Sequence, residues 1–201
     1  MTINKDKNKF KEQEKFLTNY LGIKALRTDH PAVKKIKRSQ SGQSAHGNKI
    51  WRSNFVLMDY LSTYPPNKNS KILDIGCGWG LTSVYLAKIF DAKVTASDID
   101  PNVEAFLELH KSINQCDFKF QTKAFQDYSE QDLSHYDAIV SSDICFWDEL
   151  VEPLIQFINR AKYAGVRSIY IADPGRPPFW ELCDQCVEAY DAEIVTRRIH
   201  E

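Results

Sequence analysis

The chain has 201 residues, a length typical of one domain with a substantial hydrophobic core. Apolar residues make up 43% and charged residues 26%, as in ordinary globular proteins, and the absence of an apolar run of about 18 residues argues against a membrane span. The Lys-rich start lacks the apolar segment of a signal peptide, and the five cysteines are predicted to be reduced thiols, so we expect a cytoplasmic protein.

Charge is distributed unevenly along the chain. Residues 1–50 contain 12 Lys and Arg against 4 Asp and Glu, whereas the remainder contains 14 against 23. We therefore predict a basic N-terminal extension over residues 1–50 and a separate domain over residues 51–201. The extension could contact nucleic acid or an acidic protein, or fold back on its own domain. Its apolar residues recur at near-helical spacing, which predicts one amphipathic helix, and residues 39–48 are predicted to form a loop: the helix pattern comprises Phe10, Phe16, Leu17, Tyr20 and Leu21.

Strand and helix patterns alternate through the rest of the chain. This alternation predicts an α/β fold, a Rossmann-like doubly wound and mostly parallel sheet, whose ligands lie beyond the carboxyl ends of the strands. The single CxxC, Cys183 to Cys186, lies in a predicted helix without a second pair, so we expect no metal site. The predicted strands are 71–75, 93–98, 117–122, 136–141, 167–172 and 193–199, and the predicted helices are 51–61, 80–90, 102–114, 149–163 and 178–190.

A glycine-rich turn follows the first of these strands. Its pattern is D-x-G-x-G-x-G, with Asp74, Gly76, Gly78 and Gly80 at the fixed positions. A dinucleotide fingerprint would need glycine or alanine where Leu81 stands, and a P-loop would continue with Gly-Lys-Ser/Thr. Because glycine lets the backbone approach a ligand closely, the turn predicts a cradle for a nucleotide-type cofactor. The alternative is a tight turn that binds nothing.

An acidic residue ends the second strand. Asp98 follows the glycine turn at the distance where doubly wound folds place the side chain that binds ribose hydroxyls. Asp100, followed by Pro101, is better explained as the N-cap of the next helix.

Together these two motifs resemble those of the class I, seven-strand S-adenosylmethionine (SAM) methyltransferases. The resemblance implies SAM as cofactor, S-adenosylhomocysteine as product and no metal. It places Asp74 and the three glycines at the methionyl end and Asp98 with Ile99 at the ribose. It also places the adenine beside the segment after the third strand, where Phe125 or Asp127 could contact it, although Phe125 could equally be a core residue. Members usually add a seventh, antiparallel strand, which this chain either lacks or replaces.

Two later segments narrow the resemblance. Asp143-x-x-Phe146 follows the fourth strand and Asp173-Pro174-Gly175-Arg176-Pro177 follows the fifth, as in the electron-transfer-flavoprotein β-subunit lysine methyltransferases and related bacterial methyltransferases. The likeness covers about residues 50–190 and implies that Trp51 contacts SAM. In that group Trp is followed by Pro rather than by Arg52, and a tyrosine usually stands where this chain has Phe146.

The loop after the fourth strand is where this resemblance places the acceptor. An amine must be aligned, desolvated and deprotonated before it attacks the methyl carbon. We predict that Asp143 orients the amine and also borders the cofactor, while Phe146 or Trp147 walls the channel. The alternative for each aromatic residue is a place in the core.

The sequence thus predicts a SAM-dependent methyltransferase that acts on a protein lysine. One alternative keeps the reaction and changes the acceptor to a small molecule or to RNA, which the basic extension would favour. Another is a non-catalytic SAM-fold module that binds a partner protein. We expect a protein substrate rather than nucleic acid or membrane, and the oligomeric state stays open.

Overall fold

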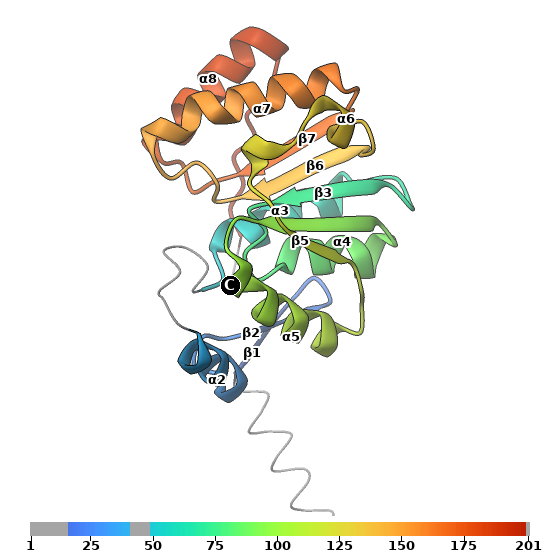
Figure 1. The fold of residues 1–201 in the computed structure, drawn as a ribbon, viewed down its shortest axis with the longest axis vertical. Coiled ribbons are helices and arrows are strands. Elements are labelled where there is room, and N and C mark those ends of the chain that lie inside the picture. The colour runs from blue at the N-terminus through green and yellow to red at the C-terminus, as the bar shows by residue number, and fades with distance from the viewer. Residues whose placement is uncertain (1–15, 41–48, 200–201) are drawn as a thin grey trace, which may run out of the picture.

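The computed structural model describes residues 16–40 and 49–199 of the chain. Its centre is a five-stranded parallel sheet with the strand order β5-β4-β3-β6-β7 (Figure 1). Chain order runs outward in both directions from β3, so the winding reverses between β3 and β6. This is the predicted doubly wound architecture. The strands are β3 (Lys71–Ile75), β4 (Lys93–Asp98), β5 (Lys119–Thr122), β6 (Ala138–Ser142) and β7 (Ser168–Ala172).

Helices connect consecutive strands and cover both faces of the sheet. The predicted helices are confirmed within a few residues. The structure also contains three short 3-10 turns and the one-turn helix α6, which the capping box of Ser129 and Asp132 stabilises. The helices are α3 (Arg52–Thr63), α4 (Leu81–Phe90), α5 (Glu104–Asn114), α6 (Glu130–Leu133), α7 (Val151–Tyr163) and α8 (Pro177–Tyr190), and the 3-10 turns are η1 (Pro101–Val103), η2 (Phe125–Asp127) and η3 (Asp148–Leu150).

Alternation along β3 divides the core into two layers. Ile72 faces α3 and α4, whereas Leu73 and Ile75 face α7, because successive strand side chains point to opposite faces. All three are essentially excluded from solvent, and each such side chain contributes about 1.5–3 kcal/mol of burial free energy. The two packed layers hold the carboxyl ends of the strands in place.

The N-terminal region differs from the prediction. Leu17 and Tyr20 lie in a β-hairpin, not in a helix: β1 (Leu17–Tyr20) pairs antiparallel with β2 (Ile23–Leu26). Leu21 and Gly22 both have positive φ (47° and 80°), the backbone of a tight two-residue hairpin turn. Phe10 and residues 41–48 of the predicted loop lie outside the described residues.

The hairpin and the following helix α2 (Pro31–Ser39) pack on the domain. Ile23 and Ala25 of β2 join the core beside α4, and Val33 of α2 packs near Trp79. Asn114 of α5 exchanges hydrogen bonds of 2.8 Å with the backbone of Lys24. Residues 16–40 therefore fold back on the body, one of the arrangements that the sequence left open.

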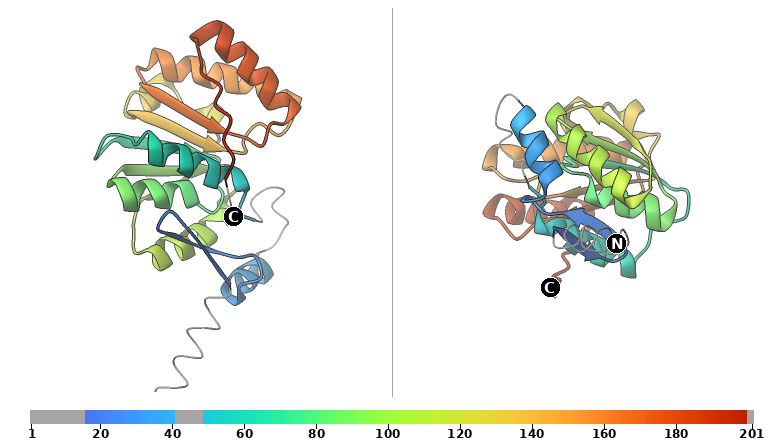
Figure 2. Two further views of the ribbon diagram at one scale, coloured as in Figure 1. Left: turned by 180° about the vertical axis from the view of Figure 1, so that it is seen from behind. Right: turned by 90° about the horizontal axis from the view of Figure 1, so that it is seen from below.

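The predicted sixth strand at 193–199 is wrong. After α8 the chain runs back toward α3 without regular structure (Figure 2). There Arg197 Nη1 pairs with Asp59 Oδ2 at 2.6 Å, and the guanidinium lies 5.1 Å from the Tyr60 ring. Ile194 and Val195 stay 46% and 43% exposed, so this apolar run is anchored by an ion pair to a helix rather than by pairing with β7.

None of the helices in the described part of the chain is long and apolar enough to cross a membrane.

Candidate functional site

A cavity of about 530 Å³ opens at the carboxyl ends of β3, β4 and β6, at the point where the winding reverses. Its volume lies within the range of small-molecule sites, and its position is the one that doubly wound sheets use for ligands. The lining combines the turns after these strands and after β5 with Lys49, Ile50, Trp51 and Asn54 ahead of and within α3. Of the predicted site residues, the lining includes Trp51, Gly76, Gly78, Asp98, Ile99, Phe125, Asp143 and Phe146.

The glycine turn has two different sides. Gly76, Gly78 and Gly80 all have positive φ, between 52° and 73°, which explains why glycine stands at each. A Cβ on Gly78 would meet nothing within 4 Å, whereas a Cβ on Gly80 would lie 3.0 Å from Leu107. Gly78 therefore presents open backbone to the cavity. Gly80 does not line the cavity, because its role is close packing against α5.

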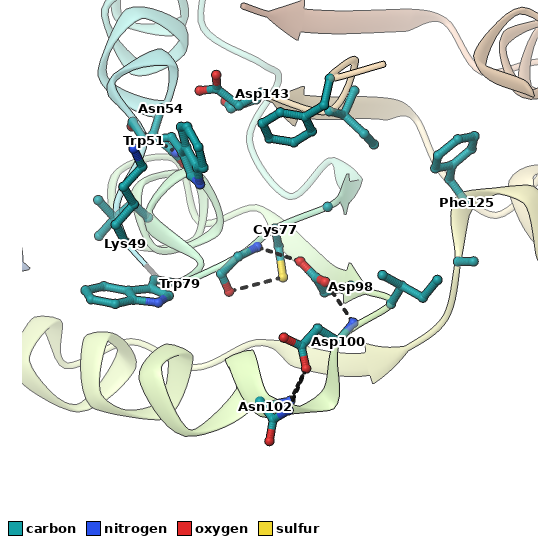
Figure 3. Close-up of a pocket in the computed structure, with 18 of the residues that line it drawn as sticks. Lys49, Trp51, Asn54, Cys77, Trp79, Asp98, Asp100, Asn102, Phe125 and Asp143 are labelled. Carbon is teal, nitrogen blue, oxygen red and sulfur yellow. Dashed lines mark hydrogen bonds between the residues drawn. The ribbon is translucent and has the colours of Figure 1, made fainter. Parts of the chain in front are cut away.

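Asp98 is held in place by the backbone on both sides. Its Oδ2 accepts a hydrogen bond from Gly78 N and its Oδ1 accepts one from Asp100 N, both at 2.9 Å (Figure 3). Burial raises the pKa of Asp98, and these backbone N–H groups partly oppose the shift. Each oxygen has a further lone pair, so the carboxylate can accept two hydroxyl groups from a ligand. Asp100 caps η1 through Asn102 N, as predicted.

Asp74 lies beneath the turn rather than in the cavity wall. It is 2% exposed, and Ser83 Oγ on α4 donates to its Oδ2 at 2.6 Å. Burial raises the pKa of Asp74 to about 7, opposed by the Ser83 hydrogen bond and reinforced by the charge of Asp98. The side chain braces the turn against α4. A contact with a ligand ammonium stays a prediction.

Asp143 begins the other wall of the cavity in a strained backbone conformation. Its φ is 56°, and its N–H donates to Ala172 O at 2.8 Å, which ties the loop after β6 to the end of β7. Oδ1 lies 2.7 Å from Arg176 Nη2. Oδ2 is buried and has no hydrogen-bond partner among the described residues. Non-glycine residues with such backbone strain cluster at functional sites.

Arg176 joins this acidic group to an aromatic pair. Its guanidinium pairs with both Asp143 and Asp173, whose side chains are 3% and 0% exposed. It also lies 4.7 Å from the Phe146 ring and 5.7 Å from the Trp51 ring. The Asp143 and Asp173 bonds raise the pKa of Arg176 despite its burial, so the cation is permanent.

Trp51 and Phe146 meet edge to face at 5.4 Å, although they lie far apart in the sequence. Both line the cavity, which agrees with the predicted aromatic wall. Trp147 does not: it is 58% exposed at the start of η3 and lies outside the lining, because alternate residues of this extended segment point in opposite directions.

The far end of the cavity is marked by Phe125, which Figure 3 shows across the open space from Trp51. Phe125 also packs on Phe157 of α7, with ring centroids 5.7 Å apart, so it serves the core and the cavity together. An apolar slot beside a polar carboxylate at Asp98 suits a nucleoside, with the ring at Phe125 and the sugar hydroxyls at Asp98.

Several lining residues were missed by sequence reasoning. Asn54 accepts from Thr82 Oγ1 at 3.0 Å and donates to Trp51 O at 3.2 Å, so it links the start of α3 to the glycine-turn helix. Trp79 stands inside the glycine motif and could have been flagged from that position. Nothing in the sequence marked Lys49 as a cavity residue.

No group of three His, Cys, Asp or Glu side chains in residues 16–40 and 49–199 could hold a metal ion.

Comparisons with known proteins all find methyltransferases. A family model described as lysine methyltransferase matches residues 31–176. The chain is 26% identical over 130 residues to the electron transfer flavoprotein beta subunit lysine methyltransferase of Homo sapiens, covering 64% of this chain and 49% of that protein. It is 32% identical over 91 residues to the ubiquinone biosynthesis O-methyltransferase of Xylella fastidiosa, covering 45% of this chain and 37% of that protein.

Among solved structures, the fold is similar to Pyrococcus abyssi tRNA (uracil-54, C5)-methyltransferase in complex with S-adenosyl-L-homocysteine. The TM-score is 0.55 at 20% identity, covering 84% of this chain and 36% of that chain. The chain spans half or less of the length of these curated relatives.

Proposed function

The chain belongs to the lysine methyltransferase family and carries a SAM-dependent methyltransferase domain, and we propose that it transfers the methyl group of SAM to a lysine amine of a protein. The observation that carries the choice of acceptor is the buried Asp143 carboxylate. Its Oδ2 lacks a partner in the described part of the chain, and it stands beside the aromatic pair of Trp51 and Phe146 at the edge of the cavity.

The residues around the cavity fit the chemistry of SAM. Gly78 leaves open space ahead of the N-terminus of α4, where the helix dipole favours a carboxylate, and Asp98 has free acceptor capacity for two ribose hydroxyls. Phe125 supplies an apolar surface for a purine ring. When bound, SAM supplies the electrophilic methyl group on a positively charged sulfur. We propose Asp74, Gly76, Gly80, Ile99 and Trp51 as supporting residues of the same cofactor site.

On the acceptor side, Asp143 performs the positioning. An incoming amine can donate a hydrogen bond to the unpartnered Oδ2, which fixes the direction of the nitrogen lone pair. The Trp51 and Phe146 rings stabilise the cation before deprotonation and again after transfer, because an aromatic face attracts an ammonium group. Exclusion of water by these rings strengthens both effects. Trp147, at the outer end of the same loop, is proposed to contact the incoming protein.

Arg176 holds the carboxylates of Asp143 and Asp173 in place but does not occupy all of their oxygens. Its two ion pairs compensate for the burial of Asp143 and Asp173 and leave one oxygen of Asp143 for the acceptor. A lysine ammonium could not replace it, because bridging the two carboxylates requires the planar, forked donors of a guanidinium. Arg176 is therefore a positioning residue in this proposal.

The experiment has two arms. Isothermal calorimetry with SAM and S-adenosylhomocysteine tests the cofactor site, and absence of heat at near-millimolar ligand would refute it. Incubation with methyl-labelled SAM and a cell lysate, followed by mass spectrometry, tests the acceptor. We expect the label on lysine side chains of protein. Label confined to RNA or to small molecules would refute the lysine acceptor and keep the reaction class.

A different acceptor, RNA, is favoured by one surface feature. Helix α2 exposes Lys34, Lys35, Lys37 and Arg38, and its Gln40 end donates to Asn102 O at the rim of the cavity. Phosphate contacts at this helix would make binding fall steeply with salt. Binding of a bulk tRNA probe that is weak and independent of salt would dismiss this alternative.

A further inference from the structure

Lys49 is a lysine of this chain that already lies in the proposed acceptor region. It lines the same cavity as Asp143 and Phe146, and its Nζ lies 3.9 Å from the centroid of the Trp51 ring. Trp51 in turn packs on Phe146. Figure 3 shows Lys49, Trp51 and Asp143 on one side of the cavity. An ammonium group on this aromatic wall occupies the kind of position that the proposed mechanism gives to the substrate amine.

The attachment of Lys49 to the protein is weak. Its side chain is exposed and its backbone lies in a bend ahead of α3, outside any helix or strand. Among the described residues no carboxylate lies within ion-pair distance of its Nζ, so the contact with Trp51 is what holds the amine. A cation on a ring that is only partly buried, with no carboxylate to hold it, is bound weakly, so the side chain can leave the ring and turn toward the cavity.

Lys123 lines the cavity as well and shows the contrast. Its Nζ pairs with Asp132 Oδ2 of α6 at 3.0 Å and lies 4.3 Å from the Tyr128 ring, so its amine is held away from the acceptor side of the cavity. Both lysines line the cavity, but Lys123 is held by a carboxylate, whereas Lys49 contacts only the Trp51 ring of the proposed acceptor wall.

We propose that Lys49 is a methylation site of this protein, modified in cis by its own active site. The inference rests on the proposed function, since it requires that the enzyme methylate lysine. The ammonium of Lys49 first releases a proton to solvent. The Nζ lone pair then attacks the methyl carbon, so a nitrogen–carbon bond forms, the carbon–sulfur bond breaks, and the electron pair stays on sulfur in neutral S-adenosylhomocysteine.

The test uses the purified full chain with methyl-labelled SAM and no other protein. Peptide mapping by mass spectrometry should find the label on the peptide that contains Lys49, with a rate constant that does not change with protein concentration. The Lys49→Arg variant, which keeps the positive charge, should lose that label. The Lys93→Arg variant should keep it, because Lys93 begins β4 at the opposite end of the sheet from the cavity.

Each outcome separates the inference from the proposed function. Label on lysate lysines with none on Lys49 would overturn the inference alone. Label on Lys49 at a rate proportional to protein concentration would overturn modification in cis. If SAM binds by calorimetry but no lysine is labelled, either in the chain or in the lysate, the lysine acceptor itself is refuted.

Discussion

The two halves of the cavity are built in different ways. At the ends of β3 and β4, the wall is made by backbone: Gly78 leaves open space beside the turn, and its N–H and that of Asp100 fix the Asp98 carboxylate. At the end of β6, the wall is made by side chains: Asp143 is strained and has a buried unpartnered oxygen, and Arg176 holds it from the segment after β7. Asp100 Oδ2, after β4, is also buried without a partner among the described residues, so the halves differ in how they are built and not in whether every polar atom is paired. A wall fixed by backbone suits a constant cofactor, and a wall of side chains suits a variable partner.

The largest effect that this comparison predicts is on Asp143. We expect Asp143→Asn to lower the rate of methyl transfer by about 10²- to 10⁴-fold, because a neutral amide cannot stabilise the positive charge that develops on the amine during transfer. Asparagine tolerates the positive φ of this position, so the backbone should survive. The measurement is the initial rate of label transfer to lysate protein, together with calorimetry for SAM affinity, which should stay near that of the wild type.

A matched control lies in the same loop. Asp148→Asn changes an exposed carboxylate and should leave the rate within about twofold, as surface substitutions usually do. If the two variants lost activity equally, or if Asp143→Asn lost SAM binding in proportion to its rate, the division between the halves would be wrong.

The next effect concerns stability. Arg176→Ala leaves the buried carboxylates of Asp143 and Asp173 without their cation, so we expect the free energy of unfolding in urea to fall by about 3 kcal/mol. Arg167→Ala removes another Arg–Asp pair, with Asp137, but its side chain is 66% exposed and the loss should be about 1 kcal/mol or less. Equal losses of unfolding free energy in the two variants would show that the ion pairs of Arg176 contribute no more than an exposed pair does.

A smaller effect should appear on the cofactor side. Asp98→Asn keeps the size of the side chain but loses the charge, and its NH2 group cannot accept the hydrogen bond that one of the two backbone N–H groups donates to the carboxylate. We therefore expect SAM affinity to fall about 30-fold, or about 2 kcal/mol. Calorimetry measures the affinity, and thermal unfolding checks that the fold is intact. Asp91→Asn, at the exposed C-cap of α4, serves as the control. An unchanged affinity would remove Asp98 from the proposed site.

These halves also differ in how far the sequence predicts them. The geometry of the half at the ends of β3 and β4 could be predicted because Asp74 to Gly80 and Asp98 form contiguous motifs whose backbone is dictated by glycine and by strand ends. Binding of the cofactor there stays a prediction. In the acceptor half, the sequence singled out Asp143 and Phe146 but could not show that Arg176 would bridge Asp143 to Asp173. That contact depends on the spacing of β6 and β7, which only the folded sheet defines.

The errors have the same origin. The near-helical spacing of Leu17, Tyr20 and Leu21 was real, but the Leu21–Gly22 turn and burial of Ile23 against α4 favoured a hairpin, so tertiary packing outweighed a local pattern. Similarly, the run at 193–199 has strand-like residues, yet Arg197 finds its partner on α3.

The smallest predicted effect tests whether Asp74 is charged in the folded protein without SAM, or is protonated and serves to hold the glycine turn against α4. Burial raises the pKa of Asp74 to about 7, whereas aspartate in an unfolded chain titrates at about 3.9. Between these values the folded protein holds a proton that the unfolded chain has released. The resulting stability is fully present below about pH 4 and is lost as the pH rises through about 7.

Asp74→Asn removes this titration while keeping an oxygen that can accept from Ser83. Without SAM, the free energy of unfolding of the variant relative to the wild type should rise by about 1–2 kcal/mol between about pH 6 and about pH 8. Urea unfolding at both values measures it, and Asp91→Asn should show no such trend. A difference independent of pH would mean that the folded protein tolerates the charged carboxylate, as a site ready to receive an ammonium group should. A rising difference would instead mean that Asp74 stays protonated as a brace until SAM arrives.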